Sequence, residues 1–392
     1  MFIPFKENSV LRRGRRRASS IAIGICLLLA ALVLCLALGE ALLRSFPGLL
    51  PEETYRRMKL GYQTFGVAHP YIGHLHTPNE VGVIEGKNFR ATHHTDKYGF
   101  RNSWPWPEAA EIVAVGDSLV FGYGVEDEQA WPAVLARGLF QSRVLNLGLI
   151  GAGPEQYLRV YETFGMRLQP KVLLVGVFMA NDPWDSKMFH SWLEDGAPGS
   201  YILWLAHDRY RFTARDPIEG MRNLGRRYSY LYNLAQDGYK IARWGSAETL
   251  RLADGSTLQL SAGYLGAAAA MTEPQRDEFR LVLDALTRLH AKATAAGTHV
   301  LVVFHPSKEE VYLPLLREPA ADLGSNLREE LRKSAIEFLN LTPVFRERAA
   351  MGKTLFFEVD GHPNVSGYAL IANAVLSHLE QNAAKYGLEI PR

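Results

Sequence analysis

The chain has 392 residues, of which 47% are hydrophobic and 21% are charged, and its formal net charge is +2. This composition excludes an intrinsically disordered chain, and the length suits one large domain or two small ones. The nearly neutral charge balance gives no reason to expect a nucleic-acid partner.

The N-terminus combines a basic cluster with an apolar run. The cluster consists of Arg12, Arg13, Arg15, Arg16 and Arg17. Residues 21–39 carry no charge, and at about 1.5 Å per residue they nearly match a hydrocarbon core of about 30 Å. With arginines before the run and Glu40 after it, the positive-inside rule predicts a single-pass anchor in the inner (cytoplasmic) membrane. The N-terminus would be cytoplasmic and the remainder periplasmic or extracellular.

Two alternatives to an anchor remain open from the sequence. Residues 37–39 (Ala-Leu-Gly) are small at the offsets of a signal-peptide cleavage site, and a buried core helix would also be apolar. We favour the uncleaved anchor because the run is long for a signal peptide. Both cysteines, Cys26 and Cys35, lie in this run, so the rest of the chain offers no disulfide or thiolate chemistry.

We expect four regions along the chain. They are a basic N-terminus at 1–18, an anchor at 19–43, a linker and accessory segment at 44–110, and an α/β domain at 111–392 that contains an aromatic-rich insertion at about 183–266. The insertion is either a lid or substrate platform over the sheet, or a subdomain with its own small core.

Histidines in the accessory segment raise the question of a metal site. They are His74, His76, His93 and His94. Few acidic residues lie near them and no i, i+4 helical spacing is present, so we interpret them as loop or sheet histidines and expect no metal.

Short apolar runs alternate with amphipathic helices from residue 111 onward. We predict strands at 112–115, 144–147, 172–179, 299–304 and 338–341, and helices at 129–140, 154–168, 327–335 and 365–381. Thr272 is predicted to cap a further helix that begins at Glu273-Pro274. This alternation predicts a doubly wound, three-layer α/β fold with a parallel sheet, in which ligands bind at the carboxyl ends of the strands.

Polar stretches fall after these predicted strands and before the last helix. They are residues 116–118 (Gly-Asp-Ser), 146–151 (Asn-Leu-Gly-Leu-Ile-Gly), 181–182 (Asn-Asp) and 360–364 (Asp-Gly-His-Pro-Asn). Acyl transfer needs a serine, a histidine that takes its proton and a carboxylate that orients the imidazole. A glycine N–H and an asparagine amide beside the N–H of the serine complete an oxyanion hole.

The four stretches, in this order, resemble the motifs of the SGNH (GDSL-type) hydrolase family, with a membrane anchor as in bacterial members. The resemblance implies that Ser118 is the nucleophile, His362 the base and Asp360 the third triad member. It also implies an oxyanion hole formed by Ser118, Gly151 and Asn181, and no cofactor.

The chain departs from the family pattern at two places. Met179 stands where the family usually has a glycine, and only one residue separates Asp360 from His362, where the family often has two. Val359 occupies the more usual position and cannot serve as a carboxylate, whereas Gly361 permits a tighter turn.

Several neighbouring residues have two interpretations. Asp182, His305 and Lys308 are candidates for substrate binding because they follow strands at the same edge, and structural turn roles are the alternative. Asp117 is expected to bond local backbone amides, and Gly148 is the second choice as oxyanion donor. The absence of a G-x-S-x-G elbow around the serine argues against the α/β-hydrolase fold.

The resemblance and the anchor together imply a serine-dependent ester hydrolase that acts through an acyl-enzyme. The substrate would be an acylated small molecule, lipid or glycan of the envelope, and the membrane would be contacted through the N-terminal helix. An O-acyltransferase that acetylates an exported polysaccharide with the same triad is the alternative, and an inactive envelope scaffold is the third possibility.

Overall fold

The computed structural model describes residues 8–50, 66–86, 88–102, 105–139, 144–206, 217–244, 248–317 and 321–389. The chain forms two compact units, and each is described here by itself. One unit comprises Met1–Gln63 and Tyr210–Tyr239, and the other comprises Thr64–Arg209 and Lys240–Arg392.

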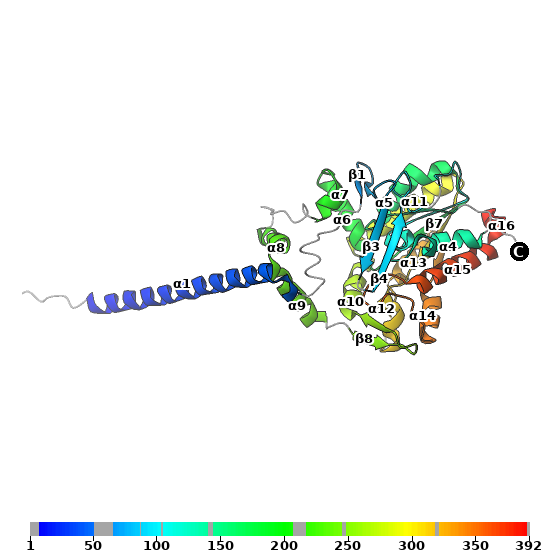
Figure 1. The fold of residues 1–392 in the computed structure, drawn as a ribbon. Helices are drawn as coiled ribbons and strands as arrows, with labels where there is room; N and C mark the ends of the chain where they lie inside the picture. Colours follow the sequence, from blue (N-terminus) through cyan, green and yellow to red (C-terminus); the bar gives the residue numbers. More distant parts are fainter. Residues whose placement is uncertain are drawn as a thin grey trace, which may run out of the picture. The chain divides into compact units, whose positions relative to one another are not determined.

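A five-stranded parallel sheet forms the centre of the larger unit (Figure 1). Its strands, in order across the sheet, are β11 (Phe338–Asn340), β10 (His299–Phe304), β7 (Val172–Val177), β5 (Ile112–Gly116) and β6 (Val144–Gly148). Numbered along the chain and read from β6, this order is 2-1-3-4-5, which is the doubly wound, flavodoxin-like topology. The predicted fold class is therefore confirmed. The sheet changes winding direction between β5 and β7, where such folds place their ligands.

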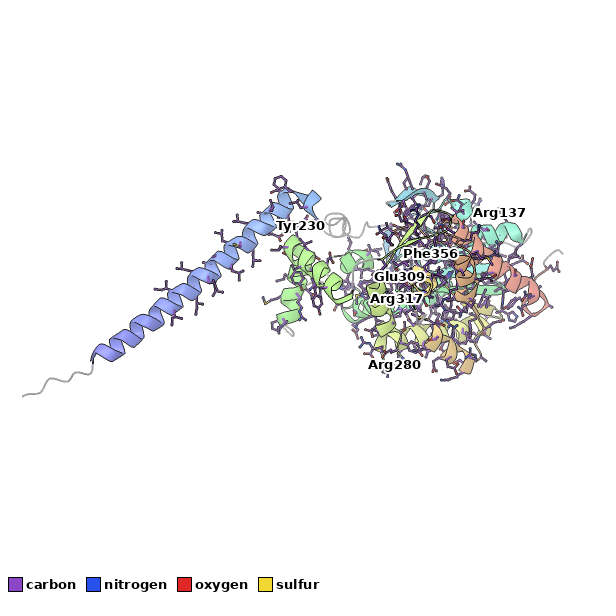
Figure 2. The ribbon with its side chains drawn as sticks, turned by 90° about the horizontal axis from the view of Figure 1, so that it is seen from below. Arg137, Tyr230, Arg280, Glu309, Arg317 and Phe356 are labelled. Carbon is purple, nitrogen blue, oxygen red and sulfur yellow. The ribbon has the colours of Figure 1, made fainter. Side chains whose placement is uncertain are left out.

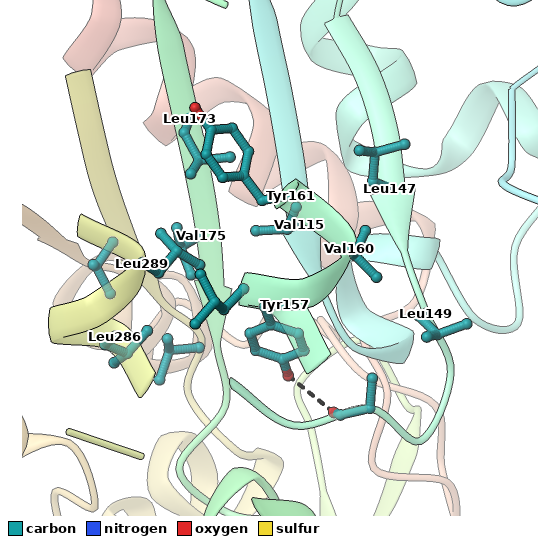
Figure 3. Packing of buried hydrophobic residues seen from close by; sticks show 14 of the residues in the cluster. Val115, Leu147, Leu149, Tyr157, Val160, Tyr161, Leu173, Val175, Leu286 and Leu289 are labelled. Carbon is teal, nitrogen blue, oxygen red and sulfur yellow. Dashed lines mark hydrogen bonds between the residues drawn. The ribbon is translucent and has the colours of Figure 1, made fainter. Parts of the chain in front are cut away.

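Helices cover both faces of the sheet, which explains why the strands are continuous apolar runs. On one face, Val113 and Val115 pack against α5 (Pro154–Val160), α11 (Asp277–Ala295) and α13 (Ser325–Lys333). Figure 3 shows this layer, with Val115 and Val175 of the sheet facing Tyr157 of α5 and Leu286 and Leu289 of α11.

Residues that alternate with these along the strands point to the opposite face. Ile112 and Ala114 pack there against α4 (Trp131–Gly138), α14 (Thr342–Ala350) and α15 (Val365–Gln381). The two faces together give the three layers predicted from the sequence.

Two helix predictions differ from the structure. Thr272 ends α10 (Ala262–Met271), where its hydroxyl donates 2.9 Å to the carbonyl of Ala269, and it does not cap the next helix. That helix, α11, begins at Asp277 instead. The single helix predicted at 154–168 is α5 followed by a π-helical turn, Tyr161–Gly165, and a 3-10 turn, Met166–Leu168.

Smaller elements surround the sheet. Antiparallel hairpins join β1 (Val67–His69) to β2 (Gly73–Leu75), β3 (Val81–Gly86) to β4 (Phe89–His94), and β8 (Glu248–Arg251) to β9 (Thr257–Leu260). The remaining helices of this unit are α3 (Ser118–Phe121), α6 (Asp182–Glu194), α7 (Tyr201–Ala206), α12 (Lys308–Tyr312) and α16 (Ala383–Tyr386).

The predicted aromatic insertion is distributed over both units. Phe189 and Trp192 of α6 pack with Tyr201 and Trp204 of α7 in a small core of their own. Residues 210–239 belong instead to the unit that contains the N-terminus. Parts of the predicted regions lie outside the described residues, namely 1–7, 51–65, 87, 103–104, 140–143, 207–216, 245–247, 318–320 and 390–392, and the region boundaries stay predictions.

The smaller unit contains α1 (Asn8–Ser45), a 3-10 turn (Pro47–Leu49), α8 (Pro217–Tyr228) and most of α9 (Tyr230–Trp244). Within α1, Ile21–Ser45 is long and apolar enough to cross a membrane, and none of its apolar window is buried in protein. This exposure excludes the core-helix alternative. A helix of this kind near an N-terminus also fits a signal sequence, so the anchor and its orientation stay predictions.

Candidate active site

Ser118 lies where the central strand β5 passes into the short helix α3. The side chain of Asp117 caps this helix by accepting the Leu119 N–H at 2.8 Å. A side chain at Gly116 would collide with Val120, so only glycine allows the turn to fold this closely. The strand end and the turn together place the Ser118 hydroxyl at the carboxyl edge of the sheet.

A continuous hydrogen-bonded series joins Ser118 to the segment before α15. The Ser118 Oγ lies 2.8 Å from the Nε2 of His362, and the Nδ1 of His362 lies 2.6 Å from the Oδ1 of Asp360. The same Oδ1 accepts the backbone N–H of His362 at 2.8 Å. Because one carboxylate oxygen accepts both bonds, the single residue between Asp360 and His362 is enough to bring the carboxylate to the imidazole.

His362 and Asp360 each favour the charged form of the other. Burial opposes protonation of His362, but the neighbouring Asp360 carboxylate outweighs it and raises the pKa of the imidazole. Burial likewise opposes ionisation of Asp360, yet its attraction to His362 and its hydrogen bonds lower the pKa of the carboxyl to about 2. The site therefore stabilises an imidazolium, which is the species formed when His362 takes a proton from a hydroxyl.

Lys308 lies beneath the segment that carries the carboxylate. Its Nζ is 3.0 to 3.4 Å from four consecutive backbone carbonyls, those of residues 357–360, which we call the triad loop. The residue is only 1% exposed, and burial lowers its pKa. Because the ammonium is enclosed by these carbonyls, its position differs from that expected of a substrate-binding lysine. It holds the loop from which Asp360 and His362 project.

The candidate oxyanion donors occupy two loops. The Gly148 N–H donates 2.9 Å to the side chain of Asn146, which leaves it unavailable to a ligand. By contrast, the N–H groups of Ser118 and Gly151 have no acceptor among the residues that the structure describes. Gly151 has φ of +72°, a left-handed conformation that favours glycine. Of the two glycines considered as oxyanion donors, Gly148 and Gly151, this geometry favours Gly151.

Two buried histidines hold the loop that contains Gly151. The Nε2 of His74 donates 2.9 Å to the Ile150 carbonyl, and the Nε2 of His76 accepts the Ile150 N–H at 3.3 Å. The Nδ1 of His76 donates to the carbonyl of Gly99 at 3.0 Å. His76 must be neutral because its Nε2 accepts a hydrogen bond, and His74 must be neutral to accept the amide of Gln156 at its Nδ1, 3.4 Å away. Burial accordingly lowers the pKa of His74 to about 4 and that of His76 to about 3.

Asn181 and Asp182 follow β7. The Nδ2 of Asn181 donates 3.1 Å to Asp117, and its second hydrogen stays available for an oxyanion. Asp182 is fully buried and accepts the Tyr157 hydroxyl at 2.6 Å and the Phe178 N–H at 2.8 Å. Burial raises the pKa of Asp182 well above its usual value. With both oxygens bonded to protein, Asp182 has the geometry of the structural alternative rather than of a substrate ligand.

His305 lies inside the domain. It is buried near Trp131, its ring nitrogens have no partner among the described residues, and burial lowers its pKa to about 3. This position also differs from that expected of a residue lining a substrate site. The described residues contain no group of three or more His, Cys, Asp or Glu side chains placed to hold a metal ion.

Sequence reasoning missed contacts that depend on the tertiary structure. The ring of Tyr123 stacks on His362, with centroids 4.4 Å apart and planes inclined by 29°. No local signal marked this tyrosine. The positions of His74 and His76 in loops or sheets were predicted, but their contacts with Ile150 join segments more than 70 residues apart.

The fold and the site together define a class: a doubly wound α/β domain with a hydrogen-bonded Ser–His–Asp series at its strand ends. No protein-family profile matches the chain, and no curated protein matches it. Solved structures similar to it are G-D-S-L family proteins and esterases.

Two of these structures illustrate the likeness. A G-D-S-L family lipolytic protein from Veillonella parvula is 14% identical, with 70% of this chain and 100% of that one covered at a TM-score of 0.37. A catalytic mutant of an acetylxylan esterase from Geobacillus stearothermophilus is 12% identical, with 73% and 98% covered at a TM-score of 0.37.

Proposed function

We propose that this protein is a serine-dependent ester hydrolase of the SGNH (GDSL) type, with Ser118, His362 and Asp360 as its triad. The observation that carries the proposal is the series of hydrogen bonds from the serine hydroxyl through both nitrogens of the imidazole to the carboxylate. That arrangement is the one that activates a hydroxyl for attack on a carbonyl.

The reaction proceeds in two halves. The Ser118 Oγ attacks the ester carbonyl while His362 takes the hydroxyl proton, and the tetrahedral intermediate then loses the alcohol, which receives that proton from His362. Water next attacks the acyl-enzyme, with His362 again accepting a proton and returning it to Ser118 as the carboxylic acid leaves. Asp360 stays ionised throughout, since its pKa of about 2 lies far below neutral pH.

The negative charge on the substrate oxygen is stabilised by the N–H groups of Ser118 and Gly151 and by the free amide hydrogen of Asn181. Asn181 is oriented by its bond to Asp117, the residue directly before the nucleophile. Preorganised donors of this kind contribute most when they need not reorient during the reaction.

The proposed substrate is an acylated glycan or lipid of the cell envelope, with the domain on the periplasmic or extracellular side of the membrane. The apolar helix at the N-terminus supports this location. The acceptor distinguishes the hydrolase from an acyltransferase, because a glycan hydroxyl would replace water in the second half of the reaction.

The test uses the full chain with a fluorophosphonate probe and p-nitrophenyl acetate. We expect covalent labelling and acetate release by the wild type, and neither by Ser118→Ala. Ser334→Ala, an exposed serine at the end of α13, is the matched control and should behave as wild type. Labelling that persists in Ser118→Ala, or a folded wild type that is never labelled, would refute the proposal. Acetyl transfer to an added glycan that outpaces hydrolysis would select the acyltransferase.

A further inference from the structure

The last turns of α1 are bonded to the start of α9. The carboxylate of Glu40 accepts the Ser229 hydroxyl at 2.9 Å and the backbone N–H groups of Tyr230 and Leu231 at 3.1 and 3.0 Å. The two backbone N–H groups are among those that a helix leaves unsatisfied at its N-terminus. A residue about 190 positions away therefore serves as the cap of α9. Figure 2 shows Tyr230 beside the end of α1.

Arg44 adds a second attachment one turn later. Its guanidinium donates to the carbonyl of Tyr228, pairs with Glu40, and lies 5.2 Å from the centre of the Tyr230 ring. The end of the apolar helix and the junction between α8 and α9 are therefore held together by a carboxylate and a guanidinium.

Helix α8 presents a row of apolar side chains to the outside. The exposed fractions are 67% for Ile218, 69% for Met221, 40% for Leu224 and 55% for Tyr228. At 100° per residue, these positions fall within an arc of about 120°. Such a row of large apolar side chains is costly in water.

The buried side of α8 packs on α9. Asn223 and Asn233 are buried, and the Nδ2 of Asn233 donates 2.9 Å to the carbonyl of Arg226 and 2.8 Å to that of Ser229. A side chain at Gly225 would meet the ring of Tyr232, so the two helices approach closely there. The orientation of the apolar row is thus fixed by the hairpin.

We propose that α8 is an interfacial helix, with Ile218, Met221, Leu224 and Tyr228 inserted at the boundary between headgroups and acyl chains of the bilayer that α1 spans. The bonds from Glu40 and Arg44 place α8 at the end of Ile21–Ser45, the point where a spanning helix leaves the hydrocarbon. Arg222, which is exposed, and Arg226 supply the positive charge that anionic headgroups attract.

This proposal makes the N-terminal helix a permanent part of the smaller unit. Cleavage after Gly39, as for a signal peptide, would separate Glu40 from the helix that carries it. The inference does not depend on the proposed esterase activity.

The test places single spin labels on the full chain, with Cys26 and Cys35 replaced by alanine, in vesicles of phosphatidylcholine and phosphatidylglycerol at 3:1. Collision rates with oxygen, which partitions into lipid, and with an aqueous nickel chelate give the depth of each label. The labelled positions are Met221→Cys, Leu29→Cys within α1, and Glu273→Cys on the exposed surface of the other unit.

We expect the oxygen-to-nickel ratio to be several-fold higher at position 221 than at 273, and higher still at 29. A label at 221 as aqueous as that at 273 would overturn the proposal. So would a label at 221 shielded from both reagents, since protein from this chain or a second copy would then cover α8. A label at position 29 with an oxygen-to-nickel ratio as low as that at 273 would exclude a membrane-spanning α1, and the proposal would be overturned with it. In vesicles of phosphatidylcholine alone, the oxygen-to-nickel ratio at position 221 should fall. An unchanged ratio would show that the arginines do not attract α8 to anionic headgroups.

Discussion

Substitution of Asp360 separates two contributions of the carboxylate, its charge and its hydrogen bonds. One oxygen accepts both the ring and the backbone N–H of His362, so an asparagine at 360 can keep both bonds with its carbonyl oxygen and lose only the charge. An alanine loses charge and orientation together.

The magnitudes follow from the burial of the pair. Two unit charges about 4 Å apart interact by about 1 kcal/mol in water and about 4 kcal/mol near a protein surface. The side chains of His362 and Asp360 are 25% and 34% exposed, which favours a value of about 2 to 3 kcal/mol after solvent screening. Asp360→Asn should therefore lower kcat/KM by roughly 30- to 150-fold. Asp360→Ala should lower it by about 10⁴-fold, the scale seen when a triad carboxylate no longer fixes the tautomer of the imidazole.

The assay is the pH dependence of kcat/KM with p-nitrophenyl acetate. Catalysis needs neutral His362, and Asp360 raises the pKa of this imidazole, so wild-type activity should fall as the pH drops below a value above the ordinary 6.5. Without the carboxylate the pKa falls, and the acid limb of both variants should move to lower pH. An Asn variant as impaired as the Ala variant would refute the shared-oxygen argument, and an unmoved acid limb would refute the charge argument.

Three further predictions concern the surroundings of the triad. Asn181→Ala should lower kcat by about 10² to 10³ with little change in thermal stability, as expected for one oxyanion donor, and full activity would exclude the residue from the mechanism. Lys308→Met removes the donor to the triad loop and should lower both kcat/KM and the free energy of unfolding, the latter by about 2 kcal/mol, whereas Lys333→Met on exposed α13 should change neither. Because His74 and His76 are neutral when folded, stability present above pH 6.5 should be lost as the pH falls toward 4, by up to about 1.4 kcal/mol per pH unit for each histidine. Thermal melts of His74→Gln should show a shallower decline, and identical slopes would contradict this assignment.

The central architecture was predictable because its determinants are local. The apolar run 299–304 and the helix pattern 365–381 coincide with β10 and α15. The order of the polar stretches also predicted which residues meet at the strand ends. The start of α11 was mispredicted because Thr272 lies at the end of α10, and α11 begins only at Asp277, after Arg276.

Contacts between distant segments were beyond sequence reasoning. Nothing near Glu40 indicates that it caps a helix starting at Tyr230, and nothing near Lys308 indicates four carbonyls some 50 residues later. The division of the aromatic insertion between two units has the same origin, since α8 and the start of α9 belong with the N-terminal helix rather than with their neighbours in the chain.

The hydrogen bonds of His74 and His76 to the backbone of Ile150 limit how far the chain can be shortened from its N-terminal side. Asn102 adds to it by exchanging hydrogen bonds with the backbone of Asn146 in the edge strand β6. A fragment starting at residue 111 would keep every strand of the sheet and Ser118, His362 and Asp360, yet the loop that contains Gly151 would lose both imidazoles. The smallest fragment worth expressing for crystallisation or screening therefore begins near residue 66, well upstream of the first strand of the sheet.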